Sequence, residues 1–109
     1  MGSKRRISYR VSVRKEVFET DLPELPEFLR QLLDELRPLL RADPFRLRGK
    51  LTAHKLRSKL AGFRAVEIEL DDDLSYHLVY RIEGKTVRVY SLAEHDLAYE
   101  RAQLRRQRR

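Results

Sequence analysis

The stretch that decides the fold is FRAVEIELDDDLSYHLVYRIEGKTVRVYSL, residues 63–92. It contains three segments, 63–70, 76–82 and 86–92, in which apolar and polar side chains alternate as they do in half-buried strands. The apolar face comprises Val66, Ile68 and Leu70 in the first segment, and Tyr76, Leu78, Tyr80 and Ile82 in the second. Glu83–Gly84–Lys85 forms a tight hairpin between the last two. Because short loops join neighbouring antiparallel strands, this stretch predicts a three-stranded meander.

A strand and a helix are predicted ahead of the meander. Residues 7–14, ISYRVSVR, alternate without a break and indicate another half-buried strand. The next segment carries one broad apolar stripe at helical spacing, made of Phe28, Leu29, Leu32, Leu33, Leu36, Leu39 and Leu40. Asp43–Pro44 ends this helix, and we expect its leucines to pack on the sheet.

The boundaries of this helix are less sharply marked. Asp21 followed by Glu24 resembles a capping box, whereas Pro26 favours a start at that proline, and the pattern does not separate the two. Pro38 lacks an N–H and would clash with the carbonyl four residues back. We therefore expect the helix to kink or break before Pro38.

The C-terminal segment, residues 93–109, predicts a short helix or tail, with an Arg-rich end at 101–109 that we expect to fray. The order of elements predicts an α+β fold in a single domain, residues 1–109. In this fold an antiparallel sheet of about four strands is packed against an N-terminal helical segment and a short C-terminal helix.

Composition narrows the functional classes. The chain has 24 Lys and Arg against 17 Asp and Glu, and its net charge of +7 favours a polyanionic partner such as RNA, DNA or an anionic membrane. It has no Cys, which excludes a disulfide scaffold, a Cys-liganded zinc site and a thiol nucleophile. No apolar run approaches the ~20 residues that span a bilayer, and the N-terminus lacks a signal-like apolar stretch, so we expect a cytoplasmic protein without a membrane partner.

The most basic stretch is residues 45–62, which contains six Lys or Arg and no acidic residue. It lacks a clear period, and we interpret it as a loop with a short turn or strand edge. A cationic run of this kind is where contacts to a phosphate backbone are expected.

Two of the three histidines lie at segment edges, where side chains from distant parts of the chain can meet. His54 lies in the basic loop and His95 follows the last strand, so we expect both at one rim of the sheet. Two imidazoles among cations suit RNA cleavage, in which a base takes the 2′-hydroxyl proton, an acid protonates the leaving 5′-oxygen, and cations hold the phosphate. His77 lies inside a strand and is interpreted as a packing or edge residue.

A metal site would have to combine these histidines with the acidic turn, Asp71–Asp72–Asp73. The spacings match no ligand pattern, and no His lies three or four residues from another. We therefore expect no metal and no cofactor. The chain also has no Gly-rich phosphate loop and no Gly-x-Ser-x-Gly elbow, which leaves nucleotide hydrolysis and acyl transfer without support.

Three stretches in order carry a resemblance to a known family: HKLRSKLAGFR at 54–64, YHLVYRIEGK at 76–85 and HDLAY at 95–99. With them the chain resembles the RelE/ParE superfamily of bacterial toxins, most closely the YafQ-type and RelE-type mRNA interferases, over about residues 45–100. The resemblance implies a small RelE-like domain. It also implies the toxin of a type II toxin–antitoxin system, a ribosome-dependent endoribonuclease that cleaves mRNA and forms a hetero-oligomer with a cognate antitoxin.

The resemblance also implies roles for particular residues. The catalytic positions that it marks are His54, Asp71, His95 and Tyr99. The candidates for RNA or phosphate binding are Lys50, Lys55, Arg57, Lys59, Arg64 and Arg81, of which the resemblance marks Lys55, Arg57 and Arg64. Glu67 stands where the YafQ branch has another histidine, and Ser58 replaces the usual loop glycine, at a cost of about 1 kcal/mol if that position needs a left-handed backbone.

Two other functions are compatible with the same fold, because a fold does not decide function. One is a non-enzymatic ParE-like gyrase inhibitor, which does not need the pair of histidines. The other is a catalytically inactive basic module that binds RNA or a partner protein.

Overall fold

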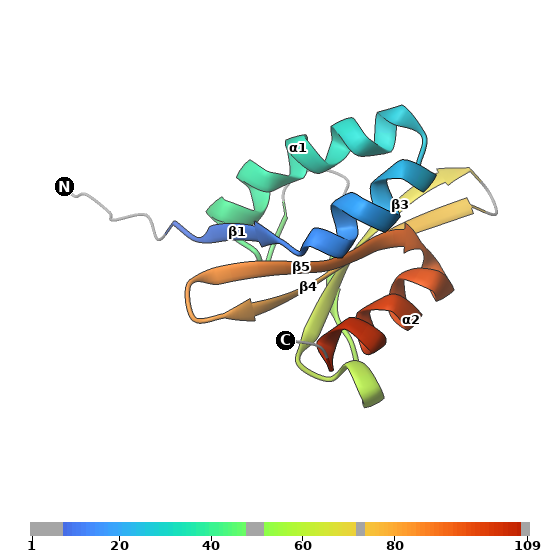
Figure 1. Ribbon diagram of the computed structural model, residues 1–109. Helices are drawn as coiled ribbons and strands as arrows, with labels where there is room; N and C mark the ends of the chain where they lie inside the picture. The colour runs from blue at the N-terminus through green and yellow to red at the C-terminus, as the bar shows by residue number, and fades with distance from the viewer. Residues whose placement is uncertain (1–7, 48–51, 72–73, 108–109) are drawn as a thin grey trace.

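The computed structural model describes residues 8–47, 52–71 and 74–107, and shows one sheet with a helix on each side (Figure 1). The elements in chain order are β1 (Arg10–Val13), η1 (Val17–Asp21), η2 (Leu22–Glu24), α1 (Glu27–Ala42), β2 (Thr52–Lys55), η3 (Ser58–Leu60), β3 (Phe63–Asp71), β4 (Leu74–Glu83), β5 (Thr86–Glu94) and α2 (His95–Arg106). The α+β class and the meander β3–β4–β5 are confirmed. Among the described helices, none combines the length and apolar character that crossing a membrane requires.

The sheet has five strands in the order β1-β5-β4-β3-β2, not about four, and it is not wholly antiparallel. β1 runs parallel to β5, with Val11 beside Val87, whereas all other neighbours are antiparallel. The additional strand, β2, lies in the basic run that was predicted to be a loop with a short turn or strand edge. It has no alternating pattern of its own, and it forms because its backbone pairs with β3, where Thr52 lies opposite Glu67.

The long helix α1 continues through Pro38 to Ala42, so of the predicted kink or break, the break does not occur. Four leucines of the predicted stripe are buried against the sheet, and they lie on both sides of the proline: Leu29, Leu33, Leu36 and Leu40. A proline inside a helix costs about 3 kcal/mol, and each buried leucine stabilises by about 1.5–3 kcal/mol, so the packing holds the helix together. Of the two predicted starts, the one at Pro26 is nearer, since Pro26 is the N-cap.

The two faces of the sheet hold separate cores. On the first face, α1 packs with Val66, Leu78 and Val87 in a core of branched and aromatic side chains. On the second face, α2 packs through Ala98 and Ala102 onto Phe63, Ala65, Val79, Tyr90 and Ala93. We refer to these as the α1 face and the α2 face.

The predicted fraying of residues 101–109 was wrong as far as Arg106, because α2 runs to that residue. Arg105 is buried and donates two hydrogen bonds to the Asp21 carboxylate, at 2.8 and 2.9 Å. Asp21 also accepts from Arg101, at 2.8 Å, and from the backbone N–H of Leu92, at 2.8 Å. The Asp21 side chain therefore makes no capping hydrogen bond to η2, and is instead the centre of a buried network that joins α2 to β5 and to η1.

Ser58, which replaces the usual loop glycine, lies in the turn between β2 and β3. Ser58 has a φ of +57°, the left-handed conformation that favours glycine. A non-glycine residue there costs on the order of 1 kcal/mol. The tight hairpin at Gly84, with a φ of +62°, is confirmed.

Candidate functional site

Three histidines from three elements meet at one end of the α2 face. His54 lies on β2 opposite Ala65, and His77 lies on β4 between Glu67 of β3 and Ala93 of β5. His95 is the first residue of α2 and follows β5 directly. The register of four strands and the start of one helix thus place these side chains together, and we call them, with Tyr99, the histidine cluster.

His77 is the centre of the cluster. Its ring centroid lies 6.3 Å from that of His54 and 4.6 Å from that of His95, with both neighbouring rings nearly perpendicular to it, at 84°. The ring of Tyr99 lies 5.5 Å from His77 and 4.5 Å from His95. His95 and Tyr99 are four residues apart on α2, so they share one side of the helix.

The environment of His77 favours its neutral form. The side chain is only 3% exposed, and burial lowers its pKa, with the nearby His95 and His54 lowering it further. The Glu67 carboxylate opposes this shift in the pKa but does not reverse it. The Nδ1 atom of His77 is buried and has no hydrogen-bond partner among the described residues. His77 is therefore an uncharged imidazole held in the middle of the cluster.

His95 is exposed and is oriented by a carboxylate. Its Nδ1 lies 2.8 Å from Oδ1 of Asp96, and half of its side chain (51%) is accessible. Because a carboxylate only accepts hydrogen bonds, this contact places a proton on Nδ1, which leaves Nε2 of the neutral ring as an acceptor. A neutral His95 with this hydrogen bond has Nε2 available to accept a proton, as a general base requires.

Tyr99 keeps its phenol proton over a wide pH range. Burial raises its pKa above the ordinary value of 10, and the charge of Glu67 raises it further. A protonated phenol beside His95 is a hydrogen-bond donor.

Two of the predicted cations lie on the other side of the sheet. Successive side chains of a strand alternate between faces, so Arg64, next to Ala65, belongs to the α1 face. There its guanidinium donates to the carbonyl of Phe45 at 3.0 Å and lies 5.4 Å from the Phe45 ring. Lys55 lies opposite Arg64 in the register, and these two residues line one pocket together with Phe45. Lys55 and Arg64 therefore lie on the face opposite the histidines, and their part in RNA or phosphate binding stays a prediction.

The other predicted cations that the structure describes are Arg57, Lys59 and Arg81, and they lie at the far end of the α2 face. Arg81 is four residues beyond His77 on the same side of β4, about 13 Å away at 3.3 Å per residue. Arg81 and Arg106 both lie over the ring of Phe63, at 5.5 and 5.7 Å. Arg57 and Lys59 are exposed nearby, where Arg106 donates to the carbonyl of Lys59. We call these four cations the basic end.

Two predicted site residues fall wholly or partly outside the described part of the structure. The backbone of Asp71 ends β3, opposite Leu74, but its side chain lies outside the described part of the structure. Lys50 also lies outside the described residues. Their roles stay predictions.

Sequence reasoning missed three members of the site: His77, Glu67 and Asp96. A signal for His77 was present, since it lies on the opposite side of its strand from Leu78 and Tyr80 and so faces α2. Although three imidazoles meet here, no group of three or more His, Asp or Glu side chains among the described residues is arranged to hold a metal ion.

Comparison with known proteins identifies the fold. No family model and no curated protein sequence matches the chain. Among solved structures, the chain is similar to the RelBE2 toxin–antitoxin complex of Mycobacterium tuberculosis, with 23% identity over 85% of this chain and 98% of that chain, at a TM-score of 0.61. It is also similar to a copper-bound mutant toxin from Helicobacter pylori, with 18% identity over 82% and 97% of the two chains, at a TM-score of 0.50. The predicted RelE-like fold is confirmed by these two structures.

Proposed function

We propose that this protein is the toxin of a type II toxin–antitoxin system and acts as an endoribonuclease on mRNA at the ribosome, in the cytoplasm, with a cognate antitoxin as its partner. The likeness of its fold to the RelBE2 toxin–antitoxin complex and to a second bacterial toxin supports the first part of this proposal. The observation that carries the enzymatic part is the histidine cluster, in which an exposed imidazole oriented by a carboxylate lies against a buried neutral one.

The cluster supports cleavage by acid–base chemistry. His95 takes the proton of a ribose 2′-hydroxyl through Nε2, and the 2′-oxygen then attacks the adjacent phosphorus. The bond from phosphorus to the 5′-oxygen breaks, and the leaving oxygen takes a proton from His54. The products are a 2′,3′-cyclic phosphate and a free 5′-hydroxyl. Proton transfers of this kind typically contribute 10²–10⁴-fold each.

The other members of the site have supporting roles. Asp96 holds the tautomer of His95, and the rings of His77 and Tyr99 hold its orientation, because both lie within about 5 Å of it. The Tyr99 phenol donates to a phosphate oxygen as negative charge builds up. The basic end, about 13 Å from the cluster, binds the phosphates of the neighbouring nucleotides.

Primer-extension mapping of cellular mRNA after induced expression tests the proposal. We expect sharp cuts with the wild type, and none with His95→Ala or His54→Ala. Gln31→Ala, an exposed change on α1, serves as a control and retains the cuts. Circular dichroism establishes that each variant is folded. Undiminished cuts with both folded histidine variants would remove the cluster from the mechanism.

A further inference from the structure

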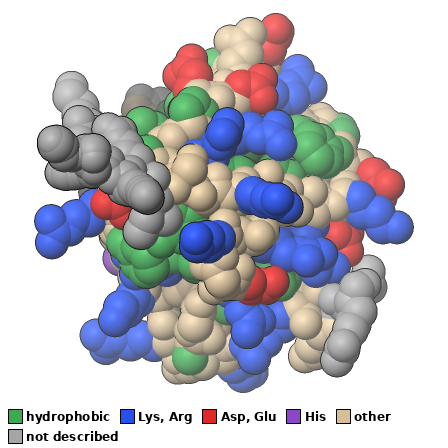
Figure 2. Space-filling view, turned by 90° about the vertical axis from the view of Figure 1, so that its left-hand side faces the viewer, with side chains coloured by type: hydrophobic (Ala, Val, Ile, Leu, Met, Phe, Trp, Pro, Cys, Tyr) green, Lys and Arg blue, Asp and Glu red, His purple; other side chains and the backbone are tan. Residues whose placement is uncertain are grey.

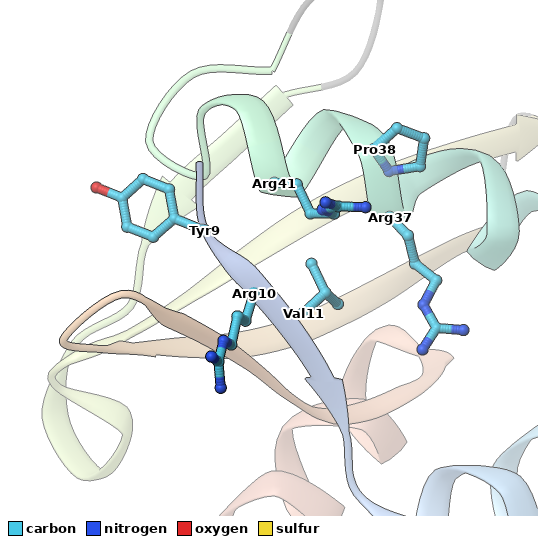
Figure 3. Close-up of a pocket in the computed structure, with 6 residues that line it drawn as sticks. All are labelled: Tyr9, Arg10, Val11, Arg37, Pro38 and Arg41. Carbon is cyan, nitrogen blue, oxygen red and sulfur yellow. The ribbon is translucent and has the colours of Figure 1, made fainter. Parts of the chain in front are cut away.

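A second surface, far from the histidine cluster, has the features of a peptide-binding groove. It lies between β1 and the last two turns of α1 and is lined by Tyr9, Arg10, Val11, Arg37, Pro38 and Arg41 (Figure 3). Its walls are apolar between three arginines and include no acidic residue. Figure 2, which views the molecule from this side, shows Lys and Arg side chains gathered across the middle of the face.

The arginines of the groove are not neutralised by the described part of the protein. No ion pair joins Arg10, Arg37 or Arg41 to any described carboxylate. Other arginines of the chain do have such partners, such as Arg101 and Arg105 on Asp21. The groove is therefore a place where positive charge is available to a ligand.

The floor of the groove is the free edge of the sheet. β1 is the outermost strand, with β5 on one side only. The N–H groups of Arg10 and Arg14 donate to the carbonyls of Lys85 and Val89 of the neighbouring hairpin. Because alternate N–H groups of a strand point to opposite sides, those of Val11 and Val13 point away from β5, to the outer edge of the sheet. Among the described residues, the backbone bond that closes this edge lies at its start, where the Tyr9 N–H donates to the carbonyl of Arg41 at 2.9 Å. Unpaired groups along such an edge are a template for an added extended chain.

The arginines lie on both sides of this edge. In Figure 3 Arg37 and Arg41 descend from α1, and the Val11 side chain points toward them, whereas Arg10 points the other way. Side chains of an extended peptide also alternate between two sides. Acidic residues on a bound strand would therefore meet Arg37 and Arg41 on one side and Arg10 on the other.

We propose that this groove binds an acidic segment of another protein in extended conformation, through the backbone of Val11 and the guanidinium groups of Arg10, Arg37 and Arg41. Residues 1–15 and residues 101–109 contain no acidic residue, so neither stretch has the chemistry of such a segment. For the same reason a second copy pairing edge to edge would oppose arginine to arginine. The inference does not depend on the chemistry of the histidines.

The experiment uses the full chain and a fluorescent 12-residue peptide of alternating Glu and Val, with binding followed by fluorescence anisotropy. We expect Arg37→Gln combined with Arg41→Gln to weaken binding at least 10-fold. The matched control, Arg30→Gln combined with Arg46→Gln, removes two exposed arginines outside the groove and changes binding less than 3-fold. Equal weakening in both double variants would overturn the proposal, because binding would then follow net charge alone.

Two further arms test the backbone contact and the class of ligand. Val11→Pro removes an outward N–H without removing a bond to β5, and we expect it to weaken binding at least 3-fold. If that variant does not fold, the peptide N-methylated at alternate residues on the wild type gives the same readout. Unchanged binding in the backbone arm would overturn the proposal. The proposal would also be overturned if a single-stranded RNA of equal charge bound more tightly than the peptide and its binding depended on Arg37 and Arg41. A dimer of the chain that is lost when the same two arginines are replaced would overturn it as well.

Discussion

The two faces of the sheet differ in the size and polarity of the side chains that hold their helices. On the α1 face, large leucines and aromatic rings form a closed apolar core. On the α2 face, the helix packs through Ala98 and Ala102, and the sheet contributes Ala65 and Ala93 beside larger residues such as Phe63. Small side chains let a helix approach a sheet closely, and this approach brings His95 and Tyr99 onto His77.

The difference teaches which parts of the molecule hold the fold and which parts hold the chemistry. A core of large apolar residues tolerates exchanges of similar volume, at a cost mainly in stability. A site assembled across β2, β3, β4 and α2 depends on register and on the position of one helix. The α1 face therefore carries the fold, and the α2 face carries the proposed reaction.

The largest effect is expected from the two histidines that flank His77 on the α2 face. His54→Ala and His95→Ala should each slow cleavage of ribosome-bound mRNA by about 10²–10⁴-fold, because each removes one proton transfer. The double variant should be little slower than the slower single variant, since groups that act as a unit are not additive. Losses that multiply in the double variant would show that the two histidines act independently.

Asp21→Ala should cost about 3–5 kcal/mol of unfolding free energy, because it leaves the buried Arg105 guanidinium without its carboxylate. This variant sharpens the comparison of the two faces, because the hydrogen-bond network of Asp21 attaches α2 to the sheet. Glu24→Gln is the control. Glu24 also pairs with Arg101 but is 55% exposed, so its loss should cost less than about 1 kcal/mol. Urea unfolding gives both values, and equal values would contradict the proposed importance of burial.

Leu36→Ala should cost about 2–5 kcal/mol, because Leu36 is fully buried under α1 and leaves a cavity. Leu104→Ala, in a residue that is 59% exposed on α2, should change stability by less than about 0.5 kcal/mol. The same urea titrations measure both. A small cost at Leu36 would mean that the α1 face does not carry the fold.

His77→Phe should make stability less sensitive to acid. The pKa of His77 is lowered in the folded protein, so below its ordinary value of 6.5 the unfolded chain binds more protons than the folded one. Stability contributed by neutral His77 is present above that pH and is lost as the pH falls. Unfolding free energies at pH 7.5 and 5.5 should therefore differ less in His77→Phe than in the wild type, where His54, His95 and Glu67 face the ring. An unchanged difference would place His77 outside the coupled cluster.

The smallest effect is expected at the basic end. Arg81→Gln should reduce by about one the slope of log binding constant against log salt concentration for single-stranded RNA, as expected for one lost phosphate contact. Arg64→Gln, on the α1 face, should leave that slope unchanged. The reverse result would place the RNA on the α1 face.

Much of the α1 face could be predicted from the sequence, because it rests on local periodicity. The alternation of β3, β4 and β5 and the leucine stripe of α1 both fix which side chains turn inward. The same alternation would have placed Arg64 with Val66, away from the histidines. The assignment of Arg64 to the site came from the resemblance instead.

The rest depends on pairing between distant segments, which no local pattern encodes. β2 has no periodicity and exists only through its contact with β3. The parallel pairing of β1 with β5 joins segments about 75 residues apart. His77 enters the site because Glu67 lies opposite it and because α2 begins at His95. The meeting of His54 and His95 was predicted from their places at segment edges, but the position of His77 between them was not.

The central claim is tested most directly by one paired measurement of single-turnover cleavage of ribosome-bound mRNA, with His95→Ala and Leu36→Ala at a temperature where both variants are folded. The account predicts that His95→Ala loses about 10²–10⁴-fold in rate, whereas Leu36→Ala cleaves within a few-fold of the wild type despite its lower stability. A folded His95→Ala protein that cleaves at the wild-type rate would contradict the claim.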